Sequence, residues 1–231
     1  MMNSACESEV VEMTMRRISS NISQELRAVT DSVASGVVPE VSEEVVIRPV
    51  QNDEEMDEVY RLTHDAYVER GYCLPQVDGR LVHYPQLDRI PETTVLVALV
   101  NGVIVGTNSL TLDGPAGLNA DLDFKNECDT IRREGRKIVS SWRLATKSSC
   151  HDERTVVMEL IRETVIRGVE MGARTGVFIL NPRHERVYQR LLNMKTVARN
   201  EGTSGLQNAP AVFMRCDFEN LPTWCLEAVA Q

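Results

Sequence analysis

The feature that most constrains the fold is the pair Asn101-Gly102, which lies between two runs rich in β-branched residues. Residues 93–100 and 103–112 have the composition of buried strands. Asn-Gly readily adopts the positive φ angles of a two-residue turn, so the pair predicts an antiparallel hairpin. The fold must therefore contain a sheet built around this hairpin.

Helix and strand patterns alternate on both sides of the hairpin. Asn52 or Asp53 is the expected cap of a first helix that ends at Gly71. The expected elements, in chain order, are a strand at 45–50, a helix at 53–70, the hairpin, a helix at 121–134, a strand at 137–147, a helix at 152–171, a strand at 176–180, a helix at 185–193, strands at 195–199 and 211–218, and a short helix around Trp224. This is the order of the GNAT acyltransferase fold, of the α/β (α+β) class, in which helices flank a mixed central sheet and two parallel strands splay apart.

Residues 1–42 differ from the rest, so we expect an N-terminal helical extension there and the acyltransferase domain at 43–231. Apolar residues recur every three or four positions, as on one face of a helix. They are Val11, Met15, Ile18, Ile22, Leu26, Val29 and Val33. This stripe either packs on its own domain or forms a dimer seam or docking helix, and the weak charge pattern beside it favours the first.

Composition limits the partners and the compartment. The chain has 231 residues and a formal net charge of −9, which argues against nucleic-acid binding. No apolar run approaches the roughly 20 residues of a membrane span, and no secretory leader is recognisable. Six cysteines without metal-ligand spacing favour free thiols in a cytoplasmic protein with no bound metal.

Several short motifs resemble one enzyme family. They are YRLTHDAYVERGY at 60–72, GTNSL at 106–110, SSWRLA at 140–145, and NPRH at 181–184 before Tyr188. Over residues 44–218 the chain resembles long-chain N-acyl amino acid synthases of the N-acyltyrosine type, which are GNAT relatives of the acyl-homoserine-lactone synthases. The resemblance implies transfer of a long fatty acyl group from acyl carrier protein to the α-amine of an amino acid, with tyrosine as the expected acceptor. No cofactor is implied besides the carrier's phosphopantetheine.

The turn at 146–154 supports a carrier-protein donor. In ordinary acetyltransferases, glycines in this turn let backbone N–H groups approach the coenzyme A pyrophosphate. Here the turn has no glycine and carries the acids Asp152 and Glu153. Carrier-bound pantetheine has no pyrophosphate and makes fewer demands on the turn. The alternative is that this turn binds pyrophosphate by another geometry.

Direct attack of an amine on a thioester needs no covalent enzyme intermediate, so no catalytic triad is required. The four histidines accordingly form no triad pattern with a nucleophile. Backbone N–H groups around residues 144–146 are expected to stabilise the oxyanion. The resemblance makes Tyr188 a candidate acid or positioning group beside the departing sulfur, with a packing role as the alternative. Homoserine-lactone synthases carry a glutamate where this chain has Ser140. The candidates for the base are a water held by Ser140 or Ser141, or an acid such as Asp88 or Glu92.

Arg143 is the one charged residue in the stretch 138–146, and a charge in a central strand is costly unless it is paired. It either binds the carboxylate of the amino acid or forms an ion pair with Asp65 or Glu69 of the first helix. The resemblance favours a role in substrate binding for Arg61, for which an i,i+4 pair with Asp65 is the alternative. The other substrate-binding candidates are Tyr72, Asp88, Trp142 and Ala145. For Tyr72 and Trp142, the alternative is that the side chain fills the core.

An acidic carrier protein needs a local basic surface on this acidic chain. Three basic sets are candidates, two beside the central strand and one at the short helix: Arg132, Arg133, Arg136 and Lys137; Lys147 and Arg154; Arg183, Arg186 and Arg190. The pair in the turn has the best position, and solvated surface charge is the alternative for all three.

Three other functions stay open at this level. They are an acetyl-CoA-dependent GNAT N-acetyltransferase, an acyl-homoserine-lactone synthase, and a non-catalytic GNAT-like binding module.

Overall fold

A computed structural model describes residues 44–150, 152–203 and 209–225. The helical extension expected at 1–42 lies outside these residues and stays a prediction. Among the described helices, none is long and apolar enough to cross a membrane.

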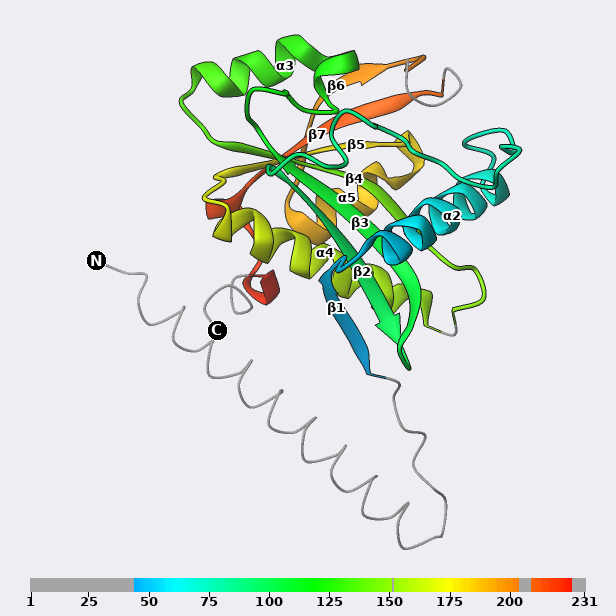
Figure 1. The fold of residues 1–231 in the computed structure, drawn as a ribbon. Helices are drawn as coiled ribbons and strands as arrows, with labels where there is room; N and C mark the ends of the chain where they lie inside the picture. The colour runs from blue at the N-terminus through cyan, green and yellow to red at the C-terminus, as the bar shows by residue number, and fades with distance from the viewer. Residues whose placement is uncertain (1–43, 151, 204–208, 226–231) are drawn as a thin grey trace, which may run out of the picture. The chain divides into compact units, whose positions relative to one another are not determined.

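Within the described residues, seven strands form one mixed sheet in the order β1-β2-β3-β4-β5-β7-β6 (Figure 1). The strands are β1 (Val45–Pro49), β2 (Thr93–Val100), β3 (Val103–Leu112), β4 (Ile138–Thr146), β5 (Thr175–Leu180), β6 (Lys195–Asn200) and β7 (Ala211–Asp217). All neighbours are antiparallel except β4 and β5. The mixed sheet confirms the fold class predicted from the order of the elements.

The hairpin is confirmed in detail. Asn101 and Gly102 have φ angles of 52° and 77° and join β2 to β3. Both angles are positive, as a two-residue hairpin turn requires.

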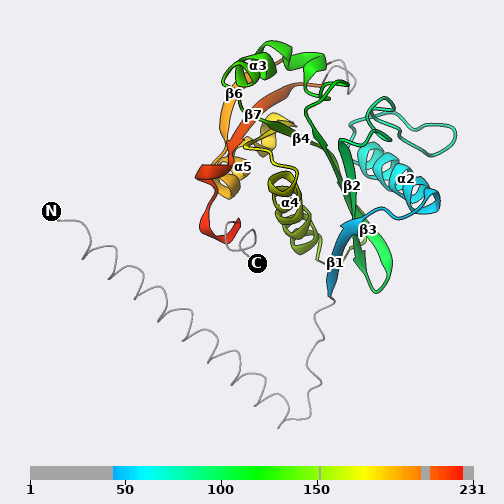
Figure 2. The same cartoon turned by 60° about the vertical axis from the view of Figure 1, so that its left-hand side comes forward.

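The helices cover both faces of the sheet. They are α2 (Asp53–Glu69), α3 (Asp121–Arg133), α4 (Glu153–Glu170) and α5 (Glu185–Leu192), with short 3-10 turns η1 (Pro182–His184) and η2 (Phe218–Asn220). Figure 2 shows α2 and α4 on opposite faces. The packing agrees, because α2 buries Val59 against Val97, whereas α4 buries Leu160 against Leu110.

Asn52 caps α2, since its side chain accepts a hydrogen bond from the Glu55 N–H at 2.8 Å. The long loop after α2 is folded onto the sheet. Tyr84 and Leu87 of this loop are buried against Trp142. The loop therefore forms a wall over the middle of β4.

The parallel strands separate as expected. Pairing between β4 and β5 runs from Ile138 to Ser141 and from Thr175 to Phe178. Both strands continue beyond these residues without pairing to each other. The gap in the ladder lies at the carboxyl ends of both strands.

Candidate active site

A β-bulge in β4 shapes the site. Trp142 pairs with Ser109 and Ala145 pairs with Thr107, so both Arg143 and Leu144 stand opposite the single residue Asn108. Arg143 has φ of 63°, which is uncommon for a residue other than glycine. The bulge breaks the alternation of β4 and places Arg143 beside Trp142, with its guanidinium 4.4 Å from the indole centroid.

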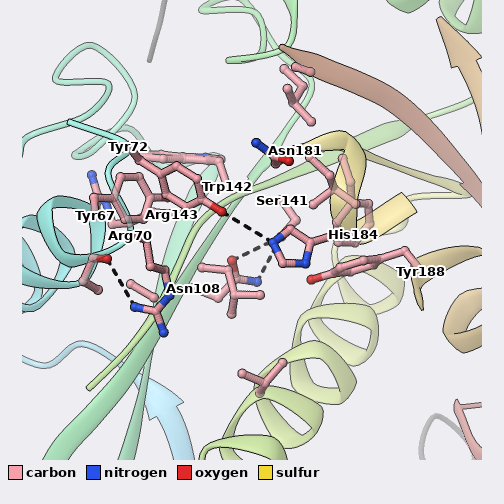
Figure 3. Close-up of a pocket in the computed structure, with 18 of the residues that line it drawn as sticks. Tyr67, Arg70, Tyr72, Asn108, Ser141, Trp142, Arg143, Asn181, His184 and Tyr188 are labelled. Atoms are coloured by element: carbon pink, nitrogen blue, oxygen red, sulfur yellow. Dashed lines mark hydrogen bonds between the residues drawn. The ribbon is translucent and has the colours of Figure 1, made fainter. Parts of the chain in front are cut away.

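A cavity of about 570 Å³ opens where β4 and β5 separate (Figure 3). Its lining includes Ala66 and Tyr67 of α2 as well as Val157 and Ile161 of α4. Because α2 and α4 lie on opposite faces, the cavity passes through the sheet. Two substrates can therefore approach from opposite faces and meet at the splay.

Arg143 is the buried charge of the α2 side of the cavity. Its side chain is 0% exposed, and one guanidinium nitrogen forms an ion pair with the buried carboxylate of Asp88. Its Nε and Nη1 atoms have no hydrogen-bond partner among the described residues. A buried donor without a partner is costly, which makes the two atoms candidates for binding an anion.

The Asp88 pair corrects one expectation about Arg143. The ion pair is formed with the long loop and not with Asp65 or Glu69 of α2. Asp65 instead contacts Nδ1 of His64 at 2.8 Å. Asp88 itself lies behind Arg143 and does not line the cavity.

Aromatic side chains surround Arg143. Trp142 and Tyr84 pack edge to face with ring centroids 5.1 Å apart. Tyr67 and Tyr72 pack in the same way at 5.6 Å. These four side chains line the cavity, as does Ala145. The sequence-predicted residues Tyr72, Trp142, Arg143 and Ala145 therefore come together.

Tyr188 and His184 form the wall on the other side. Both point into the cavity from the segment that starts α5 (Figure 3). Burial raises the pKa of Tyr188 to about 12, so its hydroxyl keeps its proton at neutral pH. Burial, and then the charges of Arg183 and Arg70, lower the pKa of His184 below its usual value, so its ring is neutral. The sequence analysis assigned no role to His184, because only the fold brings it to the cavity.

Ser141 and Ser140 differ in their access to the cavity. Ser141 lines it, and its hydroxyl is bonded at 3.0 Å to the amide of Asn108, which also donates to Thr164 of α4 at 2.6 Å. This buried network fixes β4 beside the bulge. Ser140 is fully buried and does not line the cavity. A water held in the cavity thus has access to Ser141 and not to Ser140.

The carboxylate of Glu153 links the turn before α4 to neighbouring elements. Glu153 accepts hydrogen bonds from Arg70 of α2 at 2.6 Å and from the Thr146 hydroxyl at 2.5 Å. Asp152 caps the helix by accepting from the Thr155 N–H at 3.0 Å. A carboxylate therefore lies beside the N-terminus of α4, where a helix otherwise attracts phosphate.

Arg61 is the one predicted substrate-binding arginine that the fold directs away from the cavity. Its side chain is 56% exposed and pairs with Asp57 rather than with Asp65. It does not line the cavity.

The basic set before β4 lies at the wrong end of the strand to flank the cavity. Arg132 pairs with three aspartates, and Arg136 pairs with Glu219 at 2.7 Å. Lys137 donates to the Met171 carbonyl at 2.8 Å. Arg133 is exposed on the same end of α3. The set therefore stabilises the start of β4, whereas the splay is at its end.

The other two basic sets are near the cavity. Arg154 lines it, and Lys147 is half-buried with its amine 3.4 Å from Glu58. Arg183 is stacked over the Tyr72 ring at 5.1 Å, and Arg186 and Arg190 are exposed on α5.

A splayed parallel pair, a bulged strand and a cavity through the sheet define a GNAT-type N-acyltransferase. The particular family follows from the sequence: the family model for the N-acyl amino acid synthase FeeM matches residues 58–217, so the chain belongs to this family. No curated protein sequence gives a match to the chain.

Solved structures agree on the fold. The N-acyl amino acid synthase FeeM from uncultured soil microbes has a TM-score of 0.69 and 20% identity, over 80% of this chain and 99% of that one. The CoA-dependent acyl-homoserine lactone synthase BjaI has a TM-score of 0.56 and 14% identity, over 81% and 88%. An aminoglycoside 6′-acetyltransferase type Ii has a TM-score of 0.51 and 14% identity, over 77% and 99%.

Proposed function

We propose that this N-acyltransferase moves a long fatty acyl group from acyl carrier protein to the α-amine of an aromatic amino acid, with tyrosine as the first candidate. The observation that carries the proposal is the cavity through the sheet, which has an aromatic half with a buried arginine and an apolar half. Its volume of about 570 Å³ lies in the range of small-molecule sites. An acetyl group alone would leave most of it empty.

Arg143 supports an amino acid as the acceptor. Its Nε and Nη1 donors have no partner among the described residues, and a charged donor forms a strong hydrogen bond with a carboxylate. Tyr67, Tyr72 and Trp142 line the same cavity, and their rings can pack against an aromatic side chain.

The apolar half supports a long acyl chain. Val157, Met158 and Ile161 of α4 face Leu191 and Phe178 across the cavity. Each buried methylene of an acyl chain contributes about 0.8 kcal/mol of transfer free energy. A chain of ten or more carbons therefore binds much more tightly here than an acetyl group does.

The reaction we propose is a direct transfer. The amine attacks the thioester carbonyl at the splay, and the C–N bond forms as the oxyanion develops beside the peptide groups of the bulge. Arg143 and Leu144 have no individual partner in the β3 register, and β5 no longer pairs at this level. The C–S bond then breaks, and Tyr188 supplies a proton to the departing sulfur.

The turn before α4 supports acyl carrier protein as the donor. The Glu153 carboxylate is bonded to Arg70 beside the helix N-terminus, where it would repel a pyrophosphate. Such a donor also fits the cytoplasmic location and the absence of any further cofactor that the sequence predicts. BjaI is described as CoA-dependent and has a similar fold. The experiment must therefore compare acyl-CoA with the acyl carrier protein donor.

The test is a transfer assay with purified protein. One long-chain acyl group is supplied on acyl carrier protein and on coenzyme A, with tyrosine and the other amino acids as acceptors, and products are measured by mass spectrometry. We expect N-acyltyrosine and a higher kcat/KM for the carrier-bound donor. Equal or better turnover with coenzyme A refutes the donor assignment, and acylation of another amine in preference to amino acids refutes the acceptor assignment.

A further inference from the structure

Two titratable side chains, His184 and Tyr188, line the cavity from one helical segment. Their surroundings lower the pKa of the histidine and raise the pKa of the tyrosine. His184 ends η1 and Tyr188 lies four residues later in α5, so both project from the same face. Figure 3 shows their side chains next to each other in the cavity. A pair of groups whose surroundings push their pKa values apart is the pattern of an acid and a base.

We propose that His184 is the general base that takes the proton from the acceptor amine. This proposal rests on the N-acyltransferase reaction proposed above, and it does not depend on which amino acid is acylated. The ring lies in the wall of the cavity, and its Nε2 faces the Tyr72 hydroxyl at 3.4 Å, toward the aromatic half where Arg143 lies.

The hydrogen bonds of the ring agree with this role. Arg183 Nε donates to His184 Nε2 at 3.0 Å. A nitrogen that accepts from a guanidinium carries no proton, so Nδ1 carries the hydrogen and the lone pair of Nε2 is directed toward Arg183. To reach this lone pair, an incoming amine displaces the exposed side chain of Arg183, and no helix or strand has to open.

Several other charged groups around the cavity have partners of their own, and Asp123 of α3 and Arg154 of α4 also line it. Arg70 of α2 is paired with Glu153 of α4, and Arg183 is bonded to Tyr72. Asp88 is paired with Arg143 outside the lining. His184 is the histidine among the described residues that line the cavity, and its ring is neutral.

The proton balance closes without another reactant. The amine nitrogen forms its bond to the thioester carbon and gives one proton to His184 Nε2. The C–S bond breaks, and the Tyr188 hydroxyl gives its proton to the sulfur. The imidazolium then returns a proton to the tyrosinate, directly or through solvent, and both residues are restored.

The test compares His184→Gln with the parent enzyme, using the same acyl carrier donor and two acceptors. One acceptor is the amino acid. The other is its α-hydrazino analogue, which is largely unprotonated at neutral pH and carries a more acidic N–H in the tetrahedral intermediate. We expect kcat to fall about a hundredfold or more with the amino acid, the usual contribution of a general base, and less than about tenfold with the analogue. Added imidazole should restore part of the rate in His184→Gly.

The pH profile is an independent readout. The pKa of His184 lies below its usual value, so the parent activity should fall only when acid protonates the ring, and this acid limb should be absent in His184→Gln. In Arg183→Gln the limb should move to higher pH, because a neighbouring positive charge is removed. In His64→Gln, which removes a histidine bonded to the Gln76 N–H outside the cavity, the limb should stay in place.

Equal losses with both acceptors, no rescue by imidazole and an unchanged acid limb in His184→Gln would together overturn the assignment. An inactive parent enzyme with every donor and amine would instead overturn the proposed function itself.

Discussion

Arg143 has nitrogen atoms available for both of the roles that the sequence presents as alternatives. One nitrogen of the guanidinium is paired with Asp88, and two others have no partner among the described residues. The same side chain can therefore be a structural ion pair and a carboxylate-binding group. The two roles are separable because they use different nitrogens.

Replacing Arg143 with lysine should separate them. Lysine keeps a charge for Asp88 but loses the two free donors, and a charge-assisted hydrogen bond is worth about 1.5–3 kcal/mol. We expect KM for the amino acid to rise about tenfold or more, with a small change in Tm. Arg61→Lys, the same change on the exposed face of α2, is the matched control and should leave KM unaltered.

Arg143→Ala should behave differently, because it leaves Asp88 as a buried carboxylate without its partner. Breaking a buried pair in this way costs about 3–5 kcal/mol, so a lower Tm is expected. If the lysine variant binds the amino acid as well as the parent enzyme does, Arg143 has no role beyond its ion pair.

At the scale of elements, the donor that we propose depends on the N-terminus of α4. Asp152 caps the helix, and Glu153 joins Arg70 of α2 to Thr146 of β4. This contact occupies a positive helix end with a carboxylate of the chain. It also holds α2 against the open end of the cavity.

Glu153→Gln should therefore shift the donor preference toward coenzyme A. Removing one half-exposed negative charge near a pyrophosphate relieves about 0.5–1 kcal/mol of repulsion. We expect the ratio of kcat/KM for acyl-CoA to that for acyl carrier protein to rise about two- to fivefold. Glu159→Gln removes the same charge further along α4, where the residue contacts Arg162, and should leave the ratio unchanged. An unchanged ratio in Glu153→Gln would show that Glu153 does not select the donor.

At the scale of the whole molecule, the proposed acyl carrier donor requires an acidic enzyme to bind an acidic partner. The net charge of −9 makes the average interaction repulsive, so productive docking needs a basic area beside the cavity. Lys147 and Arg154 lie at that end of β4, whereas the set around Arg133 lies at the other end. The two ends therefore provide a test and its control.

Reversing both Lys147 and Arg154 to glutamate should raise KM for acyl carrier protein, with the larger effect at low salt, where charges are less screened. Activity with a short acyl-pantetheine thioester should change little, because that donor needs no docking surface. Reversing Lys125 and Arg133 on α3 makes the same change in net charge and should have a much smaller effect. Equal losses with both donors would assign Lys147 and Arg154 to the chemistry or the fold.

Much of the fold was predictable from local patterns. The Asn101-Gly102 turn, the Asn52 cap and the apolar face of α4 act over a few residues, so their consequences can be read from sequence. The site was predictable in part: the motif at 140–145 directs attention to Trp142 and Arg143. The role that we propose for His184 was not predictable, because the motifs at 60–72 and 181–184 contain one histidine each and neither motif shows which of them reaches the cavity.

The sequence by itself determined the order of the elements, the glycine-free turn and the acidic net charge, since these depend on neighbouring residues or on composition alone. Only the tertiary structure decided which side chains meet. Arg143 reaches Asp88 across 55 residues, Arg70 reaches Glu153 across 83, and Tyr72 reaches His184 across 112. The physical reason is the bulge and the splay of β4: they turn Arg143 into the α2 side and open the sheet, and both arise from how distant strands pair rather than from any short stretch of chain.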